Sequence, residues 1–178
     1  LETVNAYIRS NNLPMRVVQS GADFSRVSDQ IKTSQSVAVV QWTGYSGAGV
    51  NSLDEWAVHD MVIDHLLKFD RSTKVILVAG ATTDGVGSLY EKVREFQKKG
   101  QLLNVILTGA MSEAGAAKPD TISKDLDLLW LVKSMKTADG KTSWEVIETP
   151  GGPSQTVQLF DHFAKYFGDR LVSMEHHV

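Results

Sequence analysis

The stretch VILVAGATTDGVGSLYEKV, residues 75–93, decides the fold of this chain. It opens with an apolar run that breaks at Gly80, passes two more glycines at Gly85 and Gly87, and continues with a helical pattern. This order predicts a buried strand, a glycine-containing loop and a helix, which is a common way of holding a phosphate. Gly80 and Gly85 have the spacing of a P-loop, but Val86 and Gly87 stand where that motif has lysine and serine or threonine. A P-loop nucleoside triphosphatase is therefore disfavoured.

Strand and helix patterns alternate along the rest of the chain. The predicted strands are 16–20, 37–42, 74–79, 102–108 and 171–175, and the predicted helices are 23–33, 53–69, 88–99 and 155–167. A parallel neighbour needs a long connection, which a helix supplies, so the sequence predicts a Rossmann-like α/β fold with a mainly parallel sheet and helices on both faces.

One pair of segments departs from this alternation. Segments 126–135 and 143–147 flank the turn formed by Ala138, Asp139, Gly140 and Lys141, which predicts a hairpin. We also expect 143–147 among the parallel strands of the sheet, together with 37–42, 74–79 and 102–108.

Composition bounds the class of protein. The chain has 178 residues, of which 42% are hydrophobic and 22% charged, and a net charge of −3. These values predict a single globular domain over 1–178, with 1–15 as an N-terminal arm. No segment concentrates Lys and Arg and no apolar run reaches the length of a membrane span, so we expect neither a nucleic-acid nor a membrane partner. The absence of cysteine suits a reducing compartment, and we expect the cytoplasm or an organelle matrix after removal of any targeting segment.

Ligands of parallel sheets bind outside the carboxyl ends of the strands. Four glycine-containing loops are expected there, at 43–52, 80–87, 109–119 and 149–156. Two of them precede a serine with a glutamate three residues later, a capping box whose helix start favours an anion. We therefore expect one site for a small phosphorylated ligand, a nucleotide monophosphate or ribose-phosphate. Its predicted ligand-binding residues are Gly44, Ser46, Gly47, Gly80, Thr82, Thr83, Asp84, Gly85, Gly87, Ser88, Gly109, Gly151, Gly152 and Thr156.

Glu55 and His59 lie four residues apart on the predicted helix 53–69, and His59 falls on its apolar side. A histidine there would act as a general base or bind a ribose hydroxyl. The alternative is a core histidine hydrogen-bonded to Glu55. We expect no metal, because Asp60 and Asp64 share a face from which His59 points away, and we expect no cofactor.

The segment WEVIETPGGPSQTVQLF, Trp144–Phe160, resembles the Pro-Gly-Gly-x-Gly-Thr-x-x-Glu motif of the LOG family, the lysine-decarboxylase-like phosphoribohydrolases. The stretch VAGATTDGVGSLYEKV is similar to the earlier glycine element of the wider SLOG superfamily, and the order of elements agrees over residues 36–175. The resemblance implies a Rossmann-like fold that binds nucleotides or their derivatives. It also implies cleavage of an N-glycosidic bond.

The sequence departs from that motif where catalysis would be located. Gln158 and Leu159 stand where the family has its catalytic glutamate, and the second glycine is missing between Gly152 and Thr156. A carboxylate from Glu55 or Asp84 would have to replace the glutamate. The alternative function is a non-catalytic structural or assembly subunit. In either case we expect a homo-oligomer or a subunit of a larger complex.

Overall fold

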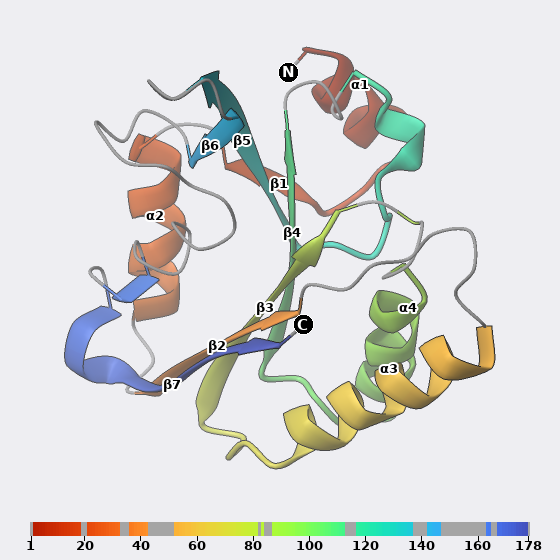
Figure 1. Cartoon of the computed structure of the whole chain (residues 1–178), viewed down its shortest axis with the longest axis vertical. Coiled ribbons are helices and arrows are strands. Elements are labelled where there is room, and N and C mark those ends of the chain that lie inside the picture. The colour runs from red at the N-terminus through yellow and green to blue at the C-terminus, as the bar shows by residue number, and fades with distance from the viewer. Residues whose placement is uncertain are drawn as a thin grey trace.

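The computed structural model describes residues 2–18, 21–32, 36–42, 52–81, 83, 87–112, 117–136, 142–146, 163–164 and 167–177. These ranges contain a sheet of seven strands with helices packed on both of its faces (Figure 1). The strands are β1 (Arg16–Val18), β2 (Ser36–Trp42), β3 (Thr73–Gly80), β4 (Val105–Ser112), β5 (Leu128–Lys136), β6 (Thr142–Val146) and β7 (Leu171–His177). The helices are α1 (Glu2–Ser10), α2 (Gly21–Lys32), α3 (Ser52–Leu67) and α4 (Gly87–Lys98), with the short 3-10 turns η1 (Pro119–Thr121) and η2 (Gly168–Arg170).

The sheet has the order β1-β5-β4-β3-β2-β7, and every neighbouring pair in this order is parallel. Strand β3 lies inside the sheet between β2 and β4, and its residues from Val75 to Ala79 are buried. Strands of this kind must be covered on both faces, because their side chains point alternately to the two sides. The predicted Rossmann-like α/β fold is therefore confirmed.

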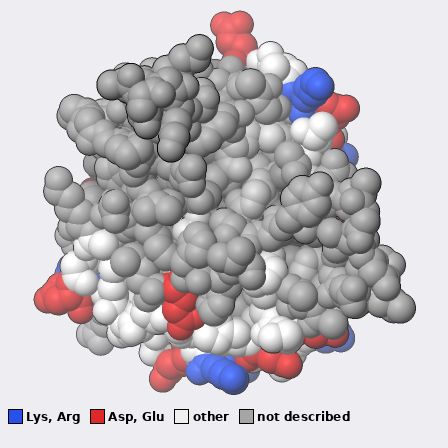
Figure 2. Space-filling view, viewed as in Figure 1, with Lys and Arg blue, Asp and Glu red and all other residues white. Residues whose placement is uncertain are grey.

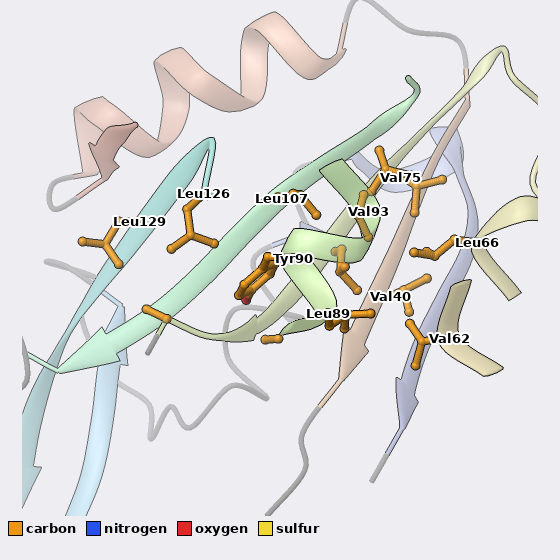
Figure 3. Close-up of a cluster of buried hydrophobic side chains, with 14 of the residues drawn as sticks. Val40, Val62, Leu66, Val75, Leu89, Tyr90, Val93, Leu107, Leu126 and Leu129 are labelled. Atoms are coloured by element: carbon orange, nitrogen blue, oxygen red, sulfur yellow. The ribbon is translucent and has the colours of Figure 1, made fainter. Parts of the chain in front are cut away.

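One face of the sheet is covered by α3 and α4. Val62 and Leu66 of α3 and Leu89, Tyr90 and Val93 of α4 pack in one cluster over apolar side chains of the central strands (Figure 3). The ion pair between Lys92 Nζ and Asp60 Oδ1, 2.7 Å long, joins the two helices. This cluster continues to α1, whose Val4 is fully buried in it.

The other face is covered by α2 and by the end of the region predicted as helix 155–167. Val27 and Ile31 of α2, with Phe163 and Phe167, pack on the side chains of β2, β3 and β5 that point away from α3. Trp130 of β5 lies edge-on to Phe163, with ring centroids 5.5 Å apart. Of the predicted helix, residues 163, 164 and 167 are helical, and the rest lies outside the described ranges.

The predicted strand 102–108 is displaced toward the C-terminus, because β4 begins at Val105 and runs to Ser112. A turn occupies the residues before it. Gly100 and Leu102 both have positive φ, and Val105 N donates to Leu102 O at 3.1 Å. The apolar character of Leu102 suggested a strand, but its side chain is buried at the corner instead of in the sheet.

The expectation that 143–147 belongs to the parallel strands is wrong. Strand β6 pairs with β5 in the antiparallel direction, with Thr142 opposite Lys136 and Val146 opposite Val132. The predicted hairpin is thereby confirmed, since a short turn reverses the chain and cannot give a parallel neighbour. As a result, the chain leaves β6 heading toward the amino ends of the parallel strands.

On the face shown in Figure 2, the described Lys and Arg side chains lie close to Asp and Glu side chains, both along the lower rim and at the upper right. Among the described residues of this face, no continuous basic patch is visible. Within the described ranges, no helix combines the length and apolar character needed to cross a membrane.

Asp127, which directly precedes β5, is bonded to β1, β4 and α4. Its Oδ2 accepts the Leu107 N–H at 2.9 Å, its Oδ1 lies 2.9 Å from Arg94, and its carbonyl accepts the Arg16 N–H at 3.0 Å. The side chain therefore serves a backbone donor and a guanidinium together.

We predict that Asp127→Ala lowers the free energy of unfolding by about 1–3 kcal/mol, because it leaves the Leu107 N–H without its side-chain acceptor and Arg94 without its carboxylate partner. The matched control is Asp60→Ala, which removes a carboxylate that is 69% exposed and that pairs, in the described part of the chain, with Lys92. The control is expected to cost less than about 1 kcal/mol. Urea unfolding of both variants measures the difference, and equal losses would contradict the role given to Asp127.

Candidate functional site

The strand order reverses direction next to β2. From β2 the chain adds β3, β4 and β5 on one side, and after β6 it returns to place β7 on the other side of β2. In open α/β sheets such a reversal opens a crevice at the carboxyl ends of the strands. Here those ends are Gln41 and Trp42 of β2, which pair with His176 and His177 of β7. The predicted site residues Gly44, Ser46 and Gly47 follow Trp42 in the sequence and lie outside the described ranges.

The same edge carries the end of β3 and the starts of two helices. Gly80 ends β3 and is exposed, and Gly87 begins α4 with Ser88 as its second residue. Helix α3 begins at Ser52, after β2. Because both helices follow carboxyl ends of neighbouring parallel strands, their N-termini lie at one edge of the sheet, where their free N–H groups favour an anion.

Tyr90 fixes the backbone where β3 ends. Its hydroxyl lies 3.0 Å from the carbonyl oxygen of Gly80 and 2.9 Å from that of Thr108, so one proton serves two acceptors. Complete burial raises the pKa of Tyr90 far above its ordinary value and keeps the phenol neutral as a donor. One side chain from α4 thus holds the end of β3 to the middle of β4.

The segment after β3 is bonded to the segment around η1. Ser123 N donates to Ala81 O at 2.8 Å, and Thr83 N donates to Thr121 O at 2.8 Å. The N–H of Thr83 is therefore already used, which differs from our expectation that backbone donors of this loop face a ligand. The Thr83 residue itself is exposed. The predicted site residues Thr82, Asp84 and Gly85 lie outside the described ranges.

Gly109 lies inside β4, opposite Ala79 of β3 and Leu129 of β5, and not in a loop after the strand. A Cβ at this position would lie 2.7 Å from Ala81 Cα and 2.9 Å from Leu126 Cδ1. The missing side chain allows the chain after β3 to cross close over β4. The structure therefore gives Gly109 a packing role.

The fourth predicted loop does not share the direction assumed for it. Gly151, Gly152 and Thr156 lie outside the described ranges, and the strand before them, β6, runs opposite to β3. The premise that the loops after β3 and after segment 143–147 leave parallel strands at one edge is therefore wrong.

His59 is 3% exposed and lies in α3 among residues that cover the sheet. It takes part in contacts with the rest of the chain, and its depth favours the interpretation as a core histidine. Glu55 lies in the first turn of the same helix. The described residues contain no group of three or more His, Asp and Glu side chains placed to hold a metal ion.

A polar cluster that the sequence did not reveal joins α3 to the edge strand β7. Glu175 pairs with His65 Nε2 through one carboxylate oxygen and accepts the Ser173 hydroxyl at 2.7 Å through the other. His65 also lies edge-on to Phe69, with ring centroids 5.4 Å apart. His65 and Glu175 are far apart in the sequence, so no local spacing indicated this contact.

We predict that Tyr90→Phe lowers the free energy of unfolding by about 1–3 kcal/mol, because the part-buried carbonyl group of Gly80 and the buried one of Thr108 lose their shared donor. Tyr7→Phe is the control, since Tyr7 is half-buried and makes no hydrogen bond within the described ranges through its hydroxyl. Urea unfolding should separate the two variants, and a loss in Tyr7→Phe as large as that in Tyr90→Phe would contradict the argument.

We predict that His59→Ala lowers the free energy of unfolding by a few kcal/mol, as expected for the loss of a buried polar side chain. The affinity for ribose 5-phosphate should not change. Urea unfolding and calorimetric titration measure the two quantities. A variant with unchanged stability and lost affinity would instead place His59 in the binding site.

No protein-family model matches the chain, and no similar curated protein was found. The resemblance to the LOG family therefore depends on the motif residues of the sequence, and the ligand must be inferred from the residues themselves.

Proposed function

We propose that this chain is a nucleotide- or ribose-phosphate-binding domain that resembles LOG-type phosphoribohydrolases. One observation carries the proposal: the strand order reverses between β2 and β7, beside the carboxyl ends of β2 and β3. Loops rich in glycine and short polar residues follow both ends, and the helices α3 and α4 begin after them. This is the place where open parallel sheets bind phosphorylated ligands.

The chemistry of these loops favours a single phosphate. The loop after Gly80 contains Thr82, Thr83 and Asp84 but no lysine. Backbone N–H groups and hydroxyls can hold one phosphate at a helix start. A triphosphate with its magnesium ion would require the lysine and the Ser/Thr of a P-loop, which Val86 and Gly87 replace.

We propose binding without cleavage of an N-glycosidic bond. Such cleavage needs a carboxylate that activates water and stabilises positive charge on the sugar. Gln158 and Leu159 stand where the resembled motif has its glutamate. Within the described part of the edge, the exposed polar group next to β3 is Thr83, which has no carboxylate.

The test adds charge at Thr83, whose side chain is exposed and whose N–H is bonded to Thr121. Thr83→Asp should lower the affinity for AMP and ribose 5-phosphate by at least about tenfold, because a carboxylate near the site repels phosphate. Thr83→Asn has nearly the same shape without the charge, and it should bind within a factor of about three. Calorimetric titration of the three proteins measures both effects.

If the unmodified protein binds neither AMP, ribose 5-phosphate nor sulfate at millimolar concentration, the proposal is wrong. If Asp and Asn at position 83 weaken binding equally, the site does not lie beside β3. The alternative, an assembly subunit that binds no ligand, would then be tested by the mass of the particle in solution.

A further inference from the structure

A cavity of about 430 Å³ opens at the amino-terminal ends of the parallel strands. Its lining comes from the starts of β1, β3, β4 and β5 and from the C-terminal halves of α2 and α4. The volume lies within the range of small-molecule sites. The proposed phosphate site lies at the opposite, carboxyl-terminal ends of these strands.

The floor of the cavity is apolar and has a cation at each end. Ile106 and Leu128 line it, and both pack with the cluster under α2. Arg16 is two residues before buried Val18 on β1, and Lys74 is two residues before buried Ile76 on β3. Side chains two residues apart on a strand point to the same face, so both basic side chains point to the face of the sheet that α2 covers. In the order β1-β5-β4-β3 the two strands are three strand spacings apart. The register places Arg16 level with Val78, four residues beyond Lys74 on β3, so the two backbones lie about 20 Å apart on a diagonal of the sheet.

The third basic residue of the lining is neutralised within the protein. Arg94 donates to the carbonyl oxygen of Asp125 at 2.6 Å and to Asp127 Oδ1 at 2.9 Å. A further guanidinium N–H bonds to Gln97 Oε1 at 2.6 Å. The charges of Arg94 and Asp127 therefore balance each other across the rim.

The two end cations keep free donors. One nitrogen of Arg16 donates to Gln30 Oε1 at 2.9 Å, which leaves other donors of its guanidinium for a ligand. Lys74 is half-buried and, within the described ranges, forms no hydrogen bond or ion pair. Among the described residues, no carboxylate pairs with either of these two cations, which lie at separate ends of an apolar floor.

We propose that this cavity binds a small organic dianion, a dicarboxylate whose two carboxylates are joined by an apolar spacer. One carboxylate would pair with Arg16, the other with Lys74, and the spacer would lie on Ile106 and Leu128. The separation of the cations selects against a compact dianion such as phosphate, which cannot reach both. The apolar floor selects against a strongly hydrated spacer. The site is independent of the proposed phosphate site.

Linear dicarboxylates from succinate to azelate test the proposal by calorimetric titration of the full chain. We expect saturable binding with an optimum at one spacer length. Hexanoate, which has one carboxylate, and inorganic phosphate, which has two charges on one centre, should bind at least about tenfold more weakly, since each forfeits one charge-assisted contact. AMP should not displace the bound dicarboxylate, because its proposed site lies at the other edge.

Two variants examine the end cations separately. Arg16→Gln and Lys74→Gln should each weaken the best dicarboxylate about tenfold. Lys118→Gln is the control, because Lys118 is exposed and its carbonyl oxygen accepts the hydroxyl of Thr121, which is bonded to Thr83 at the carboxyl ends of the strands. Thermal unfolding checks that each variant is folded, and Arg16, an exposed side chain, provides the test if Lys74→Gln is unstable.

The proposal is overturned if no dicarboxylate binds at millimolar concentration, or if phosphate binds as tightly as the best of them. It is also overturned if Lys118→Gln weakens binding as much as Arg16→Gln, since attraction would then depend on overall charge alone.

Discussion

The structure depends on the burial of β3. Residues from Val75 to Ala79 are at most 1% exposed, and both neighbouring strands pair with β3 in the parallel direction. A strand buried in this way exposes no polar side chain to water, so it needs an apolar layer on each face. Helices α3 and α4 form one layer and α2 contributes to the other. The helices that form these layers are also the connections that return the chain, so that successive strands run parallel. The same helices therefore account for both the parallel sheet and the burial of β3.

The elements with a strong hydrophobic pattern were predictable, and the errors occur where local patterns do not carry the information. Strand β3 and helix α4 were expected within one residue of their ends, because both have long buried faces bounded by glycine. The start of β4 was misplaced because Leu102 looks like a strand residue but lies buried in a turn with positive φ. The direction of 143–147 follows from its hairpin turn, and the mistake was to count it with the parallel strands.

In the candidate sites too, the features marked by a local sequence pattern were predictable, and those that depend on the spatial arrangement of strands were not. The glycine loop after β3 could be located from sequence, because Gly80 ends a buried run. The role of Gly109 could not, because a close approach to Ala81 depends on how two strands stack in space. Nor could the presence of both Arg16 and Lys74 in the lining of one cavity be predicted, since the strands that carry them are distant in the chain and only the sheet order brings them to the same cavity. A lone basic residue at the start of a strand is common and carries no signal by itself.

The position of β7 has a consequence for the order in which the protein can fold. Strand β2 contains the apolar run from Val37 to Val40, and its outer edge is covered by β7, which pairs Val37 with Leu171. During synthesis, residues 43 to 170 must be added after β2 before this partner exists. Until then β2 has an open, hydrophobic edge of the kind that pairs with other chains. Closing it requires a contact of very long sequence separation, which is slow. Strand β7 therefore covers this edge late in folding, and until it pairs, the open edge of β2 is a site for aggregation.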